Sequence, residues 1–170
     1  RLNDLEKHSD DLSAFRPAVV NVNFVKKNAS GIEVGRYSAA VHGIVPIFGE
    51  GQHIGSIEFG AGLSSELLAN IGKEFNIQSA IYFDTKSSEL GAYFEAQKEK
   101  AKGAFVLFAS SSKKIRRGAP DNLRKRVVKS GKTEVYYDNP GKNAITVSRL
   151  LDYNNKAIGT IEIHLDRTKV

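Results

Sequence analysis

Short runs of alternating apolar and polar residues dominate the chain, and one of them occurs twice. The stretch IGSIEFG at residues 54–60 has a near copy, IGTIEIH, at residues 158–164, with the same Gly, Ile and Glu in step. Each copy follows an apolar run and a short polar turn, which is the pattern of a β-hairpin. The repeat predicts two related units, and each copy is expected to be the last strand of its own antiparallel sheet.

The first half of the chain contains a predicted helix and three predicted strands. Apolar spacing within residues 10–28 favours a helix, although the alternation VVNVNFV also tolerates a strand. Two strands are expected within residues 31–48, joined near Gly35, and the glycines of GEG turn the chain into the first copy of the repeat. A helix with Ser64 or Ser65 at its start is expected to span about residues 64–76 and to link the halves.

The second half starts a new unit. Strands are predicted at residues 77–84, 104–111, 133–139, 143–152 and 156–165, with a helix or loop at 87–103 and a helix at 121–130. Two strands, helical connections and three antiparallel strands are the order of a PAS-like α+β module, with helices over one face of a five-stranded sheet. We therefore predict a partial first module at residues 1–62 and a complete second module at residues 63–170.

The charge of the chain requires a test for nucleic-acid binding. The 170 residues carry a formal net charge of +6, and many of the positive residues lie between Lys113 and Lys132. In the helix predicted at 121–130, Leu123, Val127 and Val128 share a face, with Asp121 as its N-cap and basic side chains around the rest. No aromatic platform or zinc-finger spacing accompanies it, so a solvated or membrane-proximal surface is favoured over a nucleic-acid site.

The first half resembles a known family. In residues 7–63 a DDLS…R stretch is followed by GIEVGR, by the strand GIVPIF and by GQHIGSIEFG. In this order these motifs are similar to the extracytoplasmic double Cache sensor region of bacterial methyl-accepting chemotaxis proteins and some sensor kinases. The second half resembles the family mainly in its layout. Relatives commonly carry Arg in the strand before GIVPIF, where this chain has His42.

The resemblance implies a periplasmic ligand sensor without catalytic activity or cofactor, which signals across the inner membrane. It further implies a homodimeric transmembrane chemoreceptor, anchored by helices outside this sequence, that recognises a small organic acid such as pyruvate, lactate or acetate. A sensor of a histidine kinase or of a cyclic-dinucleotide enzyme is the alternative within the family. Outside it, a basic polyanion-binding module and a purely dimerising or spacing domain remain as alternatives.

Strand parity gives two candidate ligand residues in the second module. Arg149 shares the parity of the apolar positions Ile145 and Val147, so it is expected on the core face. A buried guanidinium needs an anion, and Tyr137 is a candidate second donor, so the two form a hypothetical carboxylate clamp. The alternative is that Arg149 pairs with an internal Asp or Glu, or extends past the rim.

Two further candidates lie in the first half. Arg36 and His42 share a parity opposite to Val41 and Val45, so they could line a second site, or solvent or a helix could lie over that face. Glu58 and Glu162, the glutamates of the repeat, are interpreted as repeated structural pairings.

Signatures of catalysis and of metal binding are missing from the sequence. It contains no P-loop, no G-x-S-x-G elbow and no H-E-x-x-H, and the four histidines are scattered. Cysteine is absent, which excludes disulfides, thiolate metal sites and covalently attached haem. We therefore expect no enzyme activity and no metal site.

Overall fold

The computed structural model describes residues 17–35, 38–96, 103–113, 115, 118–138 and 142–169. Its strands form two separate antiparallel sheets, one of three strands and one of five. The two copies of the repeated strand lie in different sheets, β3 in the first and β8 in the second, which confirms the expected arrangement. The α+β architecture with PAS-like antiparallel sheets is as predicted.

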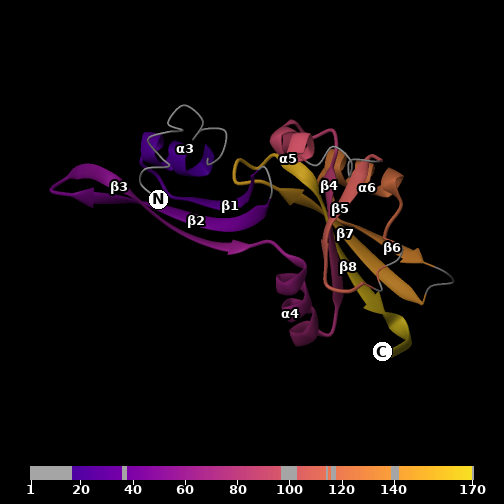
Figure 1. The fold of residues 1–170 in the computed structure, drawn as a ribbon. Helices are drawn as coiled ribbons and strands as arrows, with labels where there is room; N and C mark the ends of the chain where they lie inside the picture. Colours follow the sequence, from indigo (N-terminus) through magenta and orange to yellow (C-terminus); the bar gives the residue numbers. More distant parts are fainter. Residues whose placement is uncertain are drawn as a thin grey trace.

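The first sheet is a meander with the order β1-β2-β3. Its strands are β1 (Ala29–Val34), β2 (Ala39–Gly49) and β3 (Gln52–Gly62), and α3 (Pro17–Val25) precedes them. Figure 1 shows α3 on one side of this sheet and the β2–β3 hairpin extending away from the rest of the molecule. The part of the predicted helix before residue 17 lies outside the described residues.

The two faces of the first sheet differ. Ala18 and Val22 of α3 pack on Ile44, and all three side chains are buried. On the opposite face the cross-strand pair Val45 and Ile57 is about two-fifths exposed. Other large apolar side chains of this face are also exposed: Val41, Ile47 and Phe59. Among the described residues, α3 therefore covers one face of this sheet and the other face is left exposed.

A capped helix links the sheets, as predicted. Helix α4 (Ser65–Phe75) starts at Ser64, whose hydroxyl accepts a hydrogen bond of 3.2 Å from the Leu67 amide. It ends at Asn76, which has the left-handed conformation favoured at helix C-termini. The side-chain cap at Ser64 explains why the start of this helix could be located from the sequence.

The second sheet has the order β5-β4-β8-β7-β6, so the repeated strand β8 occupies its centre. The elements of this unit are β4 (Gln78–Asp84), a 3₁₀ turn (Ser88–Leu90), α5 (Gly91–Ala96), β5 (Phe105–Ser110), α6 (Asp121–Ser130), β6 (Glu134–Asp138), β7 (Asn143–Leu151), β8 (Ala157–Asp166) and a final 3₁₀ turn (Arg167–Lys169). Every strand predicted for this half is present. Pro120, not Asp121, is the N-cap of α6.

Helices pack on both faces of the second sheet. Leu123 and Val127 of α6 pack over Ile145 and Val147 of β7. Leu68 of α4 belongs instead to the larger core around Ile81 and Phe83 of β4. The expectation of helices over one face is wrong, because Ile81 points away from α6, to the side that the linking helix covers.

The glycines of the repeat have different physical roles. Gly159 of β8 pairs with Phe83, and a β-carbon at this position would overlap the carbonyl oxygen of Tyr82. Gly55 of β3 has open space around it but a φ of 154°, a value that residues with side chains rarely adopt. Close packing in one copy and backbone conformation in the other favour the same residue.

The β7–β8 turn joins the second unit to the first sheet. Ile32 of β1 forms a parallel bridge with Asp152, and the Tyr153 amide donates a 3.0 Å hydrogen bond to the Ile32 carbonyl. A β-carbon on Gly31 would lie 2.6 Å from the Tyr153 Cα, so only glycine allows this approach. The two sheets are therefore in direct backbone contact.

We predict that Gly159→Ala destabilises the protein by about 1 to 3 kcal/mol or more, because the added methyl group meets backbone that cannot move without breaking the β4–β8 pairing. Denaturant unfolding followed by circular dichroism measures the loss. Gly43→Ala is the matched control, since this strand glycine has nothing within 4 Å of its β-carbon position. Equal stability of the two variants would contradict the packing role of Gly159.

Candidate functional site

A buried ion pair lies between α6 and the centre of the second sheet. Arg124 Nε donates a 2.8 Å hydrogen bond to Glu162 Oε1, and Nη2 lies 2.8 Å from the same oxygen. The Glu162 side chain is fully buried, and only 6% of the Arg124 side chain is exposed. Two opposite charges at this depth are tolerated because each neutralises the other.

Other polar groups surround the ion pair of Arg124 and Glu162. The Ala119 amide donates to both Glu162 oxygens at 3.2 Å, and His164 Nε2 lies 3.1 Å from Glu162 Oε2. On the outer side Arg124 Nη1 donates to Asp121 at 2.8 Å. Both oxygens of Glu162 therefore have hydrogen-bonding or ionic partners. These partners come from the loop before α6, from α6 itself and from β8, the strand that carries Glu162.

Tyr82 of β4 borders the same centre. The guanidinium carbon of Arg124 lies 3.7 Å from the centroid of the Tyr82 ring, a cation–π contact. Burial raises the pKa of the Tyr82 phenol, and the negative charge of Glu162 raises it further. A β-carbon on Gly118 would lie 2.6 Å from the Tyr82 hydroxyl and would also meet Arg124 and Glu162, so this loop position needs glycine.

The burial of Arg124 corrects the prediction that the basic residues of α6 are solvated. Leu123 and Val127 are buried as expected. Arg124 lies three residues before Val127 and four before Val128, so helical geometry places it beside the apolar face. The position of Arg124 in the sequence therefore indicated that it could be buried. Only the buried Glu162 opposite explains why a charged side chain is accepted there.

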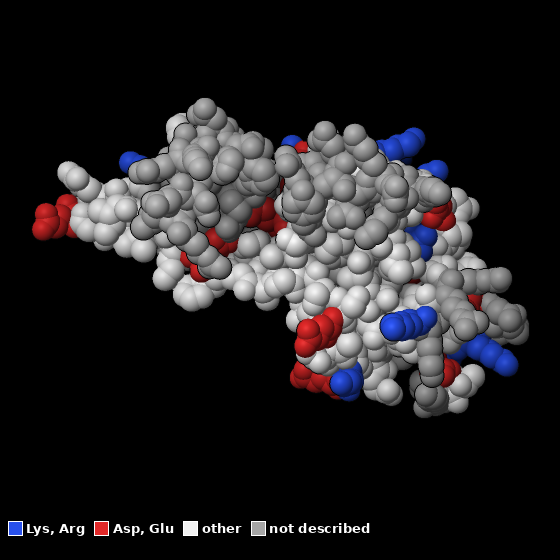
Figure 2. Space-filling view, in the orientation of Figure 1, with Lys and Arg blue, Asp and Glu red and all other residues white. Residues whose placement is uncertain are grey.

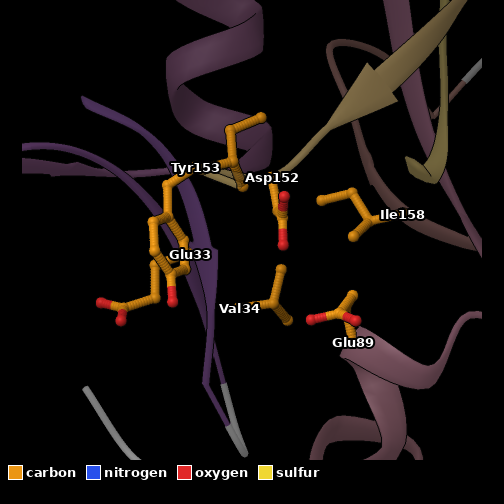
Figure 3. A pocket seen from close by; sticks show the side chains of 7 residues that line it. Glu33, Val34, Glu89, Asp152, Tyr153 and Ile158 are labelled. Carbon is orange, nitrogen blue, oxygen red and sulfur yellow. The ribbon is translucent and has the colours of Figure 1, made fainter. Parts of the chain in front are cut away.

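A small open pocket of about 80 Å³ lies where the two sheets meet. Ile32, Val34 and Ile158 supply its apolar wall, and the polar lining comes from Glu33, Glu89, Asp152 and Tyr153. Figure 3 shows the carboxylates of Asp152 and Glu89 facing the same space, with the Glu33 carboxylate on the other side of the Tyr153 ring. Burial and these carboxylates together raise the pKa of Tyr153.

Most of the pocket's carboxylates have neighbours of their own. Lys156 donates a 2.7 Å hydrogen bond to Glu89, and Asp152 accepts hydrogen bonds from the amides of Asn154 and Lys156 in the β7–β8 turn. Figure 2 shows acidic side chains in the recess between the two sheets, whereas Lys and Arg lie mainly over the second unit. The pocket therefore has the electrostatic character of a cation site.

His42 lies on the face of the first sheet that α3 covers, as one of the alternatives expected. One of its ring nitrogens contacts the Glu58 carboxylate, and its Nε2 lies 3.8 Å from Glu33 Oε2. Glu58 and Glu162, the glutamates of the repeat, thus both contact basic side chains, as the interpretation of repeated pairings predicts. Arg36, the other candidate on this face, lies outside the described residues.

Arg149 is on the predicted face but is not buried. Its side chain is exposed, and its guanidinium packs against Gly131, the residue that ends α6 in a left-handed conformation. A cation is favourable there, because the free carbonyls at a helix C-terminus carry partial negative charge. The expected burial of Arg149 is wrong, and its role in ligand binding remains a prediction.

The structure does not bring Tyr137 to Arg149. Tyr136 pairs with Ile145 and packs on the core under α6, whereas Tyr137 points to the opposite face and is 57% exposed. The ring of Tyr137 has the Arg167 guanidinium 5.4 Å from its centroid. The proposed clamp of Arg149 with Tyr137 is therefore wrong in its geometry.

Comparison with protein families agrees with this architecture. Residues 2–170 match a family described as the double sensory domain of two-component sensor kinase, one of the double Cache families. The chain belongs to this family. No curated protein matches it.

Membership defines the class of function. Double Cache sensory domains bind ligands rather than catalyse reactions, and they are typically extracellular. In the part of this sensory domain that the structure describes, no helix has the length and apolar composition of a membrane span.

We predict that Glu162→Gln destabilises the sensory domain by about 3 to 5 kcal/mol, because it leaves the Arg124 guanidinium buried without its counter-charge. Thermal and denaturant unfolding measure the change. Glu134→Gln is the control, since its partner Arg126 lies in solvent, and the loss there should be much smaller. Similar losses in both variants would show that the buried pair has no special importance.

Proposed function

We propose that this sensory domain is the periplasmic part of a bacterial transmembrane receptor and that it recognises a small organic acid of the pyruvate, lactate or acetate kind. Occupancy of its site is then passed across the inner membrane by helices outside this sequence. The family favours a two-component sensor kinase as the output. A chemoreceptor or a cyclic-dinucleotide enzyme is the alternative output.

The state of Arg149 supports an acidic ligand. Within the described part of the chain its guanidinium makes no hydrogen bond or ion pair, unlike that of Arg124, which two carboxylates neutralise. A guanidinium cannot lose its charge and offers a planar pair of donors that matches a carboxylate. The proposal of an acidic ligand depends on this observation: the Arg149 guanidinium lies beside the end of α6 without a carboxylate to neutralise it.

Thr160 is a second polar group in the same row of the sheet. It pairs with Arg149 across β7 and β8, and with Tyr82 across β8 and β4, so the three side chains share a face. The Thr160 hydroxyl is fully buried and has no hydrogen-bond partner among the described residues. This hydroxyl, in place of Tyr137, is the candidate second donor.

The affinity should be modest. A two- or three-carbon acid has little apolar surface, so charge-assisted hydrogen bonds of about 1.5 to 3 kcal/mol each must supply most of the binding energy. Two or three such bonds correspond to dissociation constants from the millimolar to the micromolar range, on the order of 4 to 8 kcal/mol.

We predict that Arg149→Ala weakens binding of the recognised acid at least tenfold, without lowering the unfolding temperature appreciably, because the side chain is exposed. Titration calorimetry with acetate, lactate and pyruvate measures the affinity. Arg126→Ala is the matched control, because it removes an equally charged, exposed side chain from α6 and should bind like wild type. If an acid binds Arg149→Ala and Arg126→Ala equally well, Arg149 does not belong to the binding site.

A small amine is the second candidate ligand, favoured by the acidic pocket between the sheets. Glu33, Glu89 and Asp152 line this pocket, and Lys156 is the basic group bonded to one of them. The same calorimetric series therefore includes methylamine and short diamines. Binding of an amine, abolished by Glu89→Gln and kept by Glu66→Gln on exposed α4, would replace the acid with a cation as the ligand class.

The remaining parts of the proposal concern partners. In the full receptor the domain is expected to act as a homodimer, and it should bind nucleic acid only weakly and without sequence preference. The basic residues of α6 support the second point only in part, since Arg124 is engaged with Glu162 and Arg126 with Glu134.

A further inference from the structure

Three potential metal ligands converge on the first sheet. Glu33, His42 and Glu58 come from the neighbouring strands β1, β2 and β3 and face the side that α3 covers. One ligand atom from each residue lies within 4.8 Å of the other two. Their side chains are mostly buried, with 4%, 15% and 26% exposed.

The surrounding backbone fixes two of these side chains. The Ala18 amide in the first turn of α3 donates a 2.9 Å hydrogen bond to Glu33 Oε1, which leaves Glu33 Oε2 on the side of His42. A β-carbon on Gly60, the cross-strand partner of His42, would lie 3.0 Å from the His42 Nδ1, so glycine provides the room for the imidazole. Outer contacts of this kind orient the ligands in known metal sites.

Each nitrogen of His42 faces a carboxylate. The buried Nδ1 contacts Glu58 in an ion-pair contact without hydrogen-bond geometry, and Nε2 faces Glu33 at 3.8 Å. Two ligand atoms of a tetrahedral zinc ion, each at about 2.1 Å from the metal, lie about 3.4 Å apart. Only one nitrogen of an imidazole can bind a given ion, but one ring nitrogen of His42 and one oxygen from each glutamate lie within 4.8 Å of one another. Small side-chain rotations therefore bring these three atoms to bonding distance from a common ion.

We propose that Glu33, His42 and Glu58 form a binding site for a divalent transition-metal ion, of which Zn²⁺ is the representative. An imidazole with carboxylates is a ligand set that suits zinc and its neighbours. Ca²⁺ and Mg²⁺ fit less well, because they prefer six or more oxygen ligands. Three protein ligands leave a fourth position for water or an external ligand.

The site is independent of the proposed acid site, because it lies on the first sheet and shares no residue with Arg149 or Thr160. It does share Glu33 with the pocket between the sheets. A bound ion would tie β1, β2 and β3 together beside the place where Ile32 meets Asp152.

Calorimetric titration of chelator-treated protein with Zn²⁺ tests the site. Wild type is expected to bind one ion per chain and to unfold at a higher temperature when zinc is present, because the ion binds the folded state. His42→Gln and Glu58→Gln should weaken zinc binding at least tenfold, and an excess of Ca²⁺ or Mg²⁺ should not compete. Circular dichroism of the metal-free variants verifies that each remains folded.

His53→Gln is the matched control, since His53 lies at the far end of the β2–β3 hairpin against Phe48. It should bind zinc like wild type. The proposal would be overturned if wild type bound no zinc, or if both His42→Gln and Glu58→Gln bound zinc as tightly as wild type. The cluster would then be an ion pair of His42 with its carboxylates and no metal site. Loss of zinc binding in His53→Gln alone would assign the ion to the hairpin tip instead.

Discussion

The second unit depends on the neutralisation of one buried charge. Glu162 is fully enclosed at the centre of the five-stranded sheet, and an isolated carboxylate in that position would cost several kcal/mol. Arg124 compensates for it from α6, and the Ala119 amide compensates from the preceding loop. Because both partners precede or lie within α6, satisfying the carboxylate also fixes the position of that helix over β7 and β8. Gly118 is required by the same constraint, since a side chain there would occupy the space of the pair.

The first sheet uses the equivalent glutamate differently. Glu58 lies on the corresponding side of its strand but contacts His42, and α3 covers the cluster in place of α6. The repeated glutamate therefore contacts an arginine in the second sheet and a histidine in the first. A guanidinium forms two fixed hydrogen bonds, whereas an imidazole between two carboxylates leaves a set of converging ligand atoms. This difference is why the first sheet is the candidate for a metal ion.

The sequence predicted the elements better than it predicted the site. Strand alternation, the Ser64 cap and the turn glycines are local signals, and they located the strands and α4 to within a few residues. Tyr137 was misplaced because its face depends on the register of β6 against β7, where Tyr136 pairs with Ile145. The cluster of Glu33, His42 and Glu58 was not found because its members come from three strands and form no local motif.

A double-mutant cycle between Arg124 and Glu162 tests most directly whether their pairing organises the second unit. Arg124→Met removes the charge and keeps much of the volume, and Glu162→Gln keeps an oxygen that can accept from the Ala119 amide. Unfolding free energies of wild type, both single variants and the double variant give the coupling. We expect each single change to be strongly destabilising and the double change to cost less than their sum, with a coupling of about 2 to 3 kcal/mol. Additive losses would contradict the account.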